Sequence, residues 1–273
     1  MPAADRPDVE PVVDPQRVDV GGYHLWMQVA GAGSPTVVFE SGGGDSSSVW
    51  SPLEGAVRSR LSVSTVLYDR AGLGKSEPKP GPYHVDDEVT ALRTALTASG
   101  VRGPIVLVAH SYGGFVSLLT AAVDPRVAGL VLVDGNIPGF FDEAEVDGLL
   151  ARFTPEIPML EKMDPTVSAV MVPLMQALPE TARRVRAASL PPGLPVIDIV
   201  AEKTWVEPPE EVAAMRKEHA AFVAASPARE AVFARGSGHY VMRDRPDLVI
   251  EAISRLVGGI RAAERAPRER AVE

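Results

Sequence analysis

Short apolar runs of strand length recur along the chain, and segments with helical periodicity separate them. The runs are apolar on both faces, as a parallel sheet covered by helices on each side requires. Alternation of such strands with helices predicts an α/β fold with a mostly parallel, doubly wound sheet. The predicted strands are Thr36–Glu40, Val63–Tyr68, Ile105–Ala109, Leu130–Asp134, Val196–Ala201 and Glu230–Ala234.

A hairpin and two amphipathic helices complete the predicted core. The segment from Val18 to Val29 turns at a pair of glycines, which favours a β-hairpin ahead of the sheet. Asp86 to Thr97 carries its apolar residues on one helical face, and Pro246 is well placed to begin a last helix. Apolar residues recur along that helix with helical spacing at Val249, Ala252, Ile253, Leu256, Val257 and Ile260.

The segment between Asp134 and Pro195 contains no convincing strand, and prolines punctuate its helical pieces. A connection this long is seldom bare loop, so we expect a helical cap, or lid, over the site beyond the carboxyl ends of the strands. Its methionines could mould around an apolar ligand or fill the seam between lid and core. Trp50 and Trp205 are candidate walls of the pocket. The expected organisation is an N-terminal tail over 1–17, a core over 18–137 and 191–262, a cap over 138–190 and a C-terminal tail over 263–273.

The composition excludes several classes of protein. Lys and Arg number 27 against 36 Asp and Glu, and a net charge of −9 disfavours binding to nucleic-acid phosphates or anionic lipids. The chain has no cysteine, which excludes disulfides, thiolate metal sites and a cysteine nucleophile. Its N-terminus has no apolar stretch typical of a signal peptide, and its apolar runs are too short to span a bilayer. We therefore expect a soluble, cytoplasmic protein.

The most specific motif is Ala109-His-Ser-Tyr-Gly113, which joins a predicted strand to a predicted helix. A small residue stands two positions before Ser111, at Ala109, and another two positions after it, at Gly113, as a tight turn between strand and helix demands. Such a turn presents the serine hydroxyl at its tip, where the N-terminus of the following helix stabilises a developing anion. The motif predicts that Ser111 is a nucleophile.

A serine nucleophile needs a base near neutral pH, and histidine is the usual one. Among five histidines, His239 follows the last predicted strand in the flexible sequence Gly236-Ser-Gly-His239. His110 is adjacent to Ser111 and cannot easily turn back onto it. His239 is therefore the predicted base.

From residue 18 to residue 260 the chain resembles the α/β-hydrolase superfamily. That resemblance implies a nucleophile, an acid and a histidine in this order along the chain, acting on a small-molecule substrate with no metal or organic cofactor. A serine nucleophile argues against the dehalogenases and epoxide hydrolases of this fold. The motifs that carry the resemblance are Val37-Val-Phe-Glu-Ser-Gly-Gly-Gly44, Tyr68-Asp-Arg-Ala-Gly-Leu-Gly-Lys-Ser76, the Ser111 turn, Leu130-Val-Leu-Val-Asp134 and Ser237-Gly-His239.

The resemblance also assigns the backbone groups that would hold an oxyanion. Ser41 stands where the superfamily usually has histidine, so the N–H groups of Gly43 and Tyr112 would form the oxyanion hole, with Gly44 as the alternative to Gly43. Asp69 belongs to the superfamily's structural Asp-x-x-Gly-x-Gly turn and is not expected to be catalytic.

The triad acid has two candidates. Many members of the superfamily place an aspartate after the strand predicted over Val196–Ala201, but here Thr204 occupies that position. Asp134, at the end of the preceding strand, is the superfamily's other known place for the acid. Glu202 is the alternative.

Together these residues predict a serine hydrolase that cleaves an ester or lactone of a largely apolar small molecule through an acyl-enzyme. Relatives on the same fold include lyases, perhydrolases and cyclases that use the triad without an acyl-enzyme, so non-hydrolytic chemistry is one alternative. A ligand-binding protein without catalysis is the other. The oligomeric state does not follow from the sequence.

Overall fold

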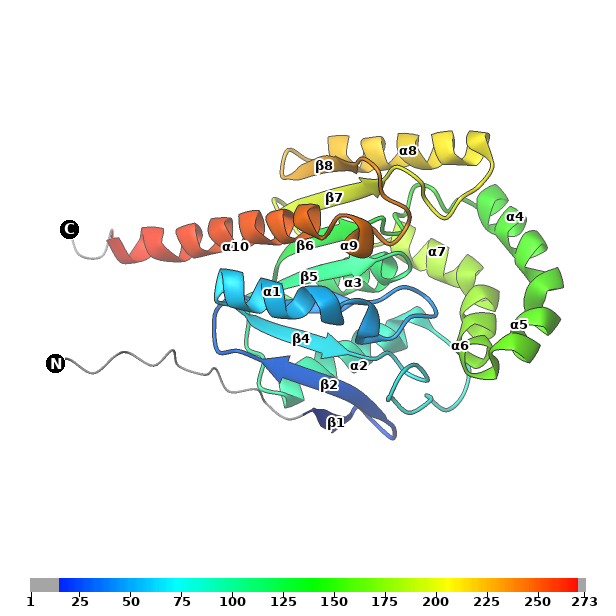
Figure 1. Ribbon diagram of the computed structural model, residues 1–273, viewed down its shortest axis with the longest axis horizontal. Helices are drawn as coiled ribbons and strands as arrows, with labels where there is room; N and C mark the ends of the chain where they lie inside the picture. The colour runs from blue at the N-terminus through cyan, green and yellow to red at the C-terminus, as the bar shows by residue number, and fades with distance from the viewer. Residues whose placement is uncertain (1–14, 270–273) are drawn as a thin grey trace.

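An eight-stranded sheet forms the centre of the protein, and the computed structural model describes residues 15–269 (Figure 1). The strand order is β1-β2-β4-β3-β5-β6-β7-β8. The pairings of β1 with β2 and of β2 with β4 are antiparallel, and all the others are parallel. The strands are β1 (Gln16–Asp19), β2 (His24–Ala30), β3 (Thr36–Glu40), β4 (Ser64–Tyr68), β5 (Ile105–His110), β6 (Val127–Val133), β7 (Val196–Ala201) and β8 (Arg229–Ala234).

Helices cover both faces of the sheet and create two apolar clusters. Along β5, Ile105 and Leu107 join the cluster under α2 (Val85–Ala98) and α3 (Gly113–Val123). Val106 and Val108 point to the opposite face, where α1 (Ser51–Leu61) and α10 (Pro246–Glu269) pack. Because successive side chains of a strand face opposite sides of the sheet, a strand that is buried on both sides is largely apolar, as the predicted strands are. The predicted fold class is confirmed.

Three predicted boundaries move by more than one residue in the structure. β6 begins at Val127, ahead of the predicted start at Leu130. β1 begins at Gln16, within the predicted N-terminal tail, whose residues 1–14 lie outside the described part of the chain. At the other end α10 continues to Glu269, so part of the predicted C-terminal tail is helical. Arg261 anchors this extension by donating hydrogen bonds to the carbonyls of Ser34 and Ser62.

Between β6 and β7 the chain forms a set of helices that we call the cap helices. Figure 1 shows them beyond the carboxyl ends of the parallel strands. Asp142 and Asp164 are the N-cap residues of two of them, and the side chain of each accepts a hydrogen bond from the backbone N–H three residues later. The cap helices are α4 (Glu143–Phe153), the 3₁₀ turn η2 (Thr154–Glu156), α5 (Ile157–Met163), α6 (Pro165–Gln176) and α7 (Leu178–Arg186).

Three further elements complete the fold. The 3₁₀ turn η1 (Ser47–Val49) precedes α1, α8 (Pro209–Ala224) joins β7 to β8, and α9 (Val241–Asp244) follows β8. Of the helices within residues 15–269, none is long and apolar enough to cross a membrane.

Candidate active site

Ser111 occupies the turn between β5 and α3 with a φ of 52°, in the left-handed region that non-glycine residues rarely adopt. The Ser111 carbonyl accepts hydrogen bonds from the N–H groups of Gly114 (2.9 Å) and Asn136 (2.8 Å), which hold this conformation. A Cβ atom at Gly113 would lie only 2.6 Å from Glu40 Cγ, so the turn requires glycine there. The sequence motif therefore has the strained geometry that exposes a serine hydroxyl.

His239 lies in the loop after β8, and Asp134 directly follows β6. His239 Nδ1 is 2.7 Å from Asp134 Oδ2. The Asp134 side chain is fully buried, and its carboxylate also accepts hydrogen bonds from the Ala201 N–H (3.0 Å) and the Thr204 hydroxyl (2.8 Å). Burial alone would raise the pKa of Asp134, but the contact with His239 and the hydrogen bonds from Ala201 and Thr204 together outweigh it and hold that pKa below its usual value.

Glu202, the alternative acid, lies in a different environment. Its Oε2 accepts a 2.7 Å hydrogen bond from the Gly236 N–H at the base of the loop that carries His239. The structure thus brings Asp134 into contact with His239 and assigns Glu202 to the backbone of the loop.

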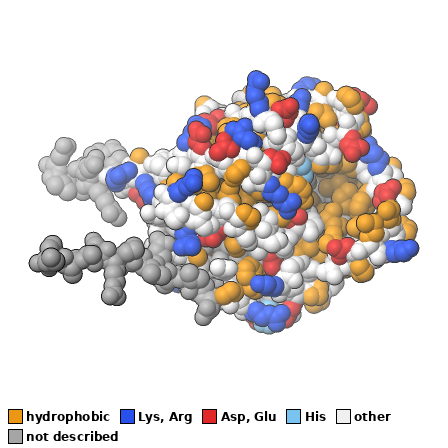
Figure 2. All heavy atoms as spheres, in the orientation of Figure 1, with side chains coloured by type: hydrophobic (Ala, Val, Ile, Leu, Met, Phe, Trp, Pro, Cys, Tyr) orange, Lys and Arg blue, Asp and Glu red, His pale blue; other side chains and the backbone are white. Residues whose placement is uncertain are grey.

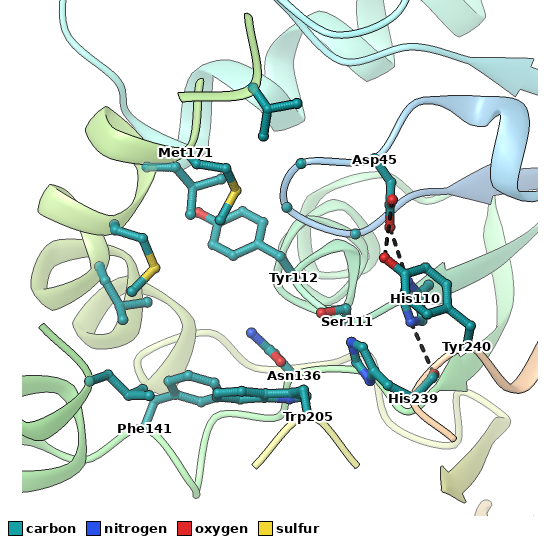
Figure 3. A pocket seen from close by; sticks show the side chains of 18 residues that line it. Asp45, His110, Ser111, Tyr112, Asn136, Phe141, Met171, Trp205, His239 and Tyr240 are labelled. Atoms are coloured by element: carbon teal, nitrogen blue, oxygen red, sulfur yellow. Dashed lines mark hydrogen bonds and ion pairs between the residues drawn. The ribbon is translucent and has the colours of Figure 1, made fainter. Parts of the chain in front are cut away.

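Ser111 and His239 line the same cavity, of about 380 Å³, between the sheet and the cap helices. Figure 3 shows the two side chains next to each other at the rim of this cavity. Since Asp134 contacts Nδ1, the imidazole has Nε2 available for a hydroxyl group. Figure 2 shows the hollow from outside, bordered by hydrophobic side chains.

Arg70 organises the glycine loop that follows β3. Its guanidinium donates hydrogen bonds to the carbonyls of Ser41 (2.6 Å), Gly42 (2.6 Å) and Gly43 (2.7 Å), and pairs with Glu40 at 2.7 Å. Both charged side chains are buried, and burial raises the pKa of Glu40 while Arg70 limits that rise. The carbonyls of Ser41, Gly42 and Gly43 therefore point toward the Arg70 guanidinium, which fixes the conformation of the loop.

The candidate oxyanion groups lie at the cavity. The cavity is lined by Gly43, Gly44 and Tyr112. Tyr112 is the N-cap residue of α3, directly before its first residue Gly113. A Cβ at Gly43 would lie 3.0 Å from Met171 Sδ, so glycine leaves room between the loop and the cap helices.

Asp69 has the contacts of a structural residue, as the sequence suggested. Its carboxylate accepts hydrogen bonds from the backbone N–H and hydroxyl of Ser47 and from the Lys75 N–H. At Gly74, where φ is 53°, a Cβ would lie 2.2 Å from Asp69 Oδ2. Asp69 thus ties the turn after β4 to η1.

Sequence reasoning missed Arg70 and a second cluster beneath His239. His110 Nε2 lies 3.2 Å from the His239 carbonyl, and its ring centroid is 4.4 Å from that of His239. Tyr240 donates a 3.2 Å hydrogen bond to Asp45, whose Oδ2 is 3.7 Å from His110 Nδ1 (Figure 3). Burial lowers the pKa of His110, which favours its neutral form. Glu40, a charged residue at the end of an apolar strand, was the feature that could have indicated a buried cation such as Arg70.

Most of the other side chains that line the cavity are apolar. Two of the methionines in the cap helices line it, whereas Met159 and Met163 are 59% and 71% exposed, so these two neither mould around a ligand nor fill the seam. Trp205 lines the cavity, but Trp50 is buried against Phe39 on the other face of the sheet, and its prediction as a wall was wrong. The apolar lining comprises Phe141, Leu149, Val167, Met171, Leu174, Met175, Leu178 and Trp205.

Comparison with known proteins places these features in a family. The model of the Alpha/beta hydrolase family matches residues 37–252. The uncharacterized protein YqjL of Bacillus subtilis is 37% identical over 105 residues, covering 38% of this chain and 41% of YqjL. Lipase LipV of Mycobacterium tuberculosis is 45% identical over 86 residues, covering 30% of this chain and 32% of LipV. The chain thus spans less than half the length of these curated relatives.

Solved structures agree in fold. The enol-lactonase from Burkholderia xenovorans LB400 has a TM-score of 0.60 and 18% sequence identity, over 89% of this chain and 100% of the enol-lactonase chain. At this identity the likeness concerns the fold alone.

Proposed function

Because this chain belongs to the alpha/beta hydrolase family, we propose that it is a serine hydrolase that cleaves an ester or lactone of a largely apolar small molecule. The observation that carries the proposal is one constellation of side chains. Ser111, on a strained turn, shares a cavity with His239, whose Nδ1 is 2.7 Å from the buried carboxylate of Asp134.

Each of the three residues takes one role in the proposed reaction. Ser111 Oγ attacks the carbonyl carbon while His239 Nε2 accepts its proton and then donates that proton to the leaving alcohol. Asp134 orients the imidazole and stabilises the imidazolium. Water then attacks the acyl-enzyme as His239 accepts one of its protons, and His239 returns that proton to Ser111 Oγ as the acid is released.

The oxyanion that forms in both steps needs hydrogen-bond donors. We assign the backbone N–H groups of Gly43 and Tyr112, since both residues line the cavity beside Ser111. The N-terminus of α3 adds a favourable dipole. Removing one such donor typically costs ~10²–10³ in rate.

The cavity supports an apolar, uncharged acyl group. Its lining contains neither lysine nor arginine, so a substrate carboxylate or phosphate would find no cation among the lining residues. Lipase LipV, by its name an enzyme for apolar esters, is a relative that agrees with this choice.

Labelling with a fluorophosphonate, read by intact-mass spectrometry, tests the proposal. We expect one adduct on the wild type, none on Ser111→Ala and slow labelling of His239→Ala. Ser62→Ala is a matched control, because Ser62 also has a positive φ (49°) but is exposed and lies outside the cavity lining. This variant should be labelled like the wild type.

A panel of esters and lactones then tests turnover. Hydrolysis that is lost in Ser111→Ala would support the proposal. Activity that requires Ser111 without a trappable acyl-enzyme would favour a lyase, perhydrolase or cyclase. Ligand binding without labelling or turnover would favour a binding protein, and either result would overturn the hydrolase assignment.

A further inference from the structure

Asn136 has a buried carboxamide that the proposed reaction does not use. The residue is 6% exposed and lines the cavity, and its Oδ1 has no hydrogen-bond partner among the described residues. Buried polar atoms in folded proteins are nearly always paired, and an exception in the wall of a cavity is a group that can bond to a ligand. Figure 3 shows Asn136 between Ser111 and the rings of Phe141 and Trp205.

The backbone of Asn136 already has its own structural role. Its N–H donates a 2.8 Å hydrogen bond to the Ser111 carbonyl, and a Cβ at Gly114 would lie 2.6 Å from the Asn136 carbonyl oxygen. Any residue other than proline could make the N–H contact. The fold therefore accounts for the position of residue 136 but not for an amide at the end of its side chain.

Trp205 contributes a second unpartnered atom to the same lining. Its Nε1 is buried without a hydrogen-bond partner among the described residues. The indole is stacked with Phe141 at a centroid distance of 6.3 Å, which keeps the ring in the apolar part of the cavity. Asn136 Oδ1 and Trp205 Nε1 thus both lack partners beside the apolar side chains of the lining.

We propose that the Asn136 carboxamide binds a hydroxyl substituent on the acyl group of the substrate. Its unpartnered Oδ1 is an acceptor, so it suits a group that donates a hydrogen bond, which a keto oxygen cannot do. Because the Asn136 backbone contacts that of Ser111 and its side chain is short, the substituent belongs on C2 or C3, next to the carbonyl that Ser111 attacks. This inference rests on the proposed function and narrows its substrate class.

The test compares p-nitrophenyl butanoate with its 2-hydroxy, 3-hydroxy and 3-oxo counterparts. For the wild type we expect kcat/KM to be at least ~10-fold higher for one hydroxylated ester than for the butanoate, because a site built to bind a hydroxyl leaves its amide unpaired when that hydroxyl is absent. The 3-oxo ester should gain no such advantage. Asn136→Leu should reduce this ratio to near one by slowing the hydroxylated ester. Met159→Leu, a change at an exposed position outside the cavity lining, should keep the wild-type ratio.

Fluorophosphonate labelling separates this inference from the proposed function. Asn136→Leu should still form the Ser111 adduct, since the probe has no hydroxyl on its alkyl chain. Asn136→Ala, which also removes the carboxamide, should lose the preference and serves if the leucine variant does not fold. An unchanged ratio in these variants, or a wild type that labels and hydrolyses esters without preferring a hydroxylated one, would overturn the role of Asn136 alone. A wild type that neither labels nor hydrolyses any ester would overturn the proposed function itself.

Discussion

The hydroxyl of Thr204 donates a 2.8 Å hydrogen bond to Asp134 Oδ2, the oxygen that also lies 2.7 Å from His239 Nδ1. Thr204 occupies the place where many α/β hydrolases carry the triad acid. Here that position supports a carboxylate supplied by the preceding strand. β6 and β7 are neighbours in the sheet, and the Asp134 N–H bonds to the Ile199 carbonyl at 2.7 Å, so the two loops emerge side by side.

Asp134→Asn should lower kcat by ~10³–10⁴ while leaving the fold intact. The amide has nearly the same shape as the carboxylate, but it carries no charge to stabilise the imidazolium, and its NH₂ group can favour the wrong tautomer of His239. Ester hydrolysis by purified variants measures the effect. Glu202→Gln is the control and should retain activity within a few-fold; a larger loss in Glu202→Gln than in Asp134→Asn would reverse the assignment of the acid.

Thr204→Val should lower kcat by ~5-fold, with little change in KM. The variant keeps the volume but removes one hydrogen bond to Asp134, and a net hydrogen bond is worth about 1 kcal/mol. Thr204→Ser, which restores the hydroxyl, should recover most of the activity. Equal losses in the valine and serine variants would indicate that packing, and not the hydrogen bond, matters at this position.

Arg70→Met should destabilise the protein and displace the glycine loop. The change leaves Glu40 without its cation and frees three carbonyls, and breaking a buried ion pair costs about 3–5 kcal/mol. Urea unfolding measures the stability, and the rate of fluorophosphonate labelling reports on the oxyanion loop. The double variant Arg70→Met/Glu40→Gln should regain part of the stability but not the labelling rate. Full recovery of labelling would show that Arg70 only neutralises Glu40.

Asp124→Asn should give a stability difference that depends on pH. Burial alone would raise the pKa of Asp124, but hydrogen bonds from Arg126 outweigh it and hold the pKa below its usual value. A lowered pKa means that the carboxylate stabilises the fold above the unfolded-state pKa, about 4, and that this contribution is lost as pH falls through the folded-state pKa.

We expect the wild type to exceed Asp124→Asn by about 2 kcal/mol in free energy of unfolding at pH 7, and by progressively less below pH 4. Urea unfolding at pH 7, 5 and 3 measures this trend. Asp247→Asn, at an exposed ion pair with Arg245, should be nearly neutral throughout. A difference that stays constant from pH 7 to pH 3 would contradict the assignment.

The sequence alone was sufficient to predict the sheet and the two residues at the centre of the candidate site. Apolar runs such as Ile105–Ala109 predict buried parallel strands. The turn at Ser111 leaves no room for a side chain at residue 113, and the glycine there is visible in the sequence. His239 could be selected because it follows the last strand.

Contacts between distant positions could not be predicted in the same way. Arg70 and Glu40 are 30 residues apart. The resemblance that favoured Asp134 over Glu202 could not show which carboxylate contacts His239, because that depends on how the loops after β6 and β7 lie together. Asn136 carries no recognisable motif, because its importance lies in the absence of a partner inside a folded cavity.

The order of the strands has a consequence for the time at which the site can first exist. Asp134 and His239 are 105 residues apart, and His239 follows β8, which lies at the edge of the sheet and pairs only with β7. During synthesis the ribosome therefore releases the proposed nucleophile well before the base that would activate it. If His239 is the base, Ser111 remains unactivated until β8 and the loop after it have been added to the sheet.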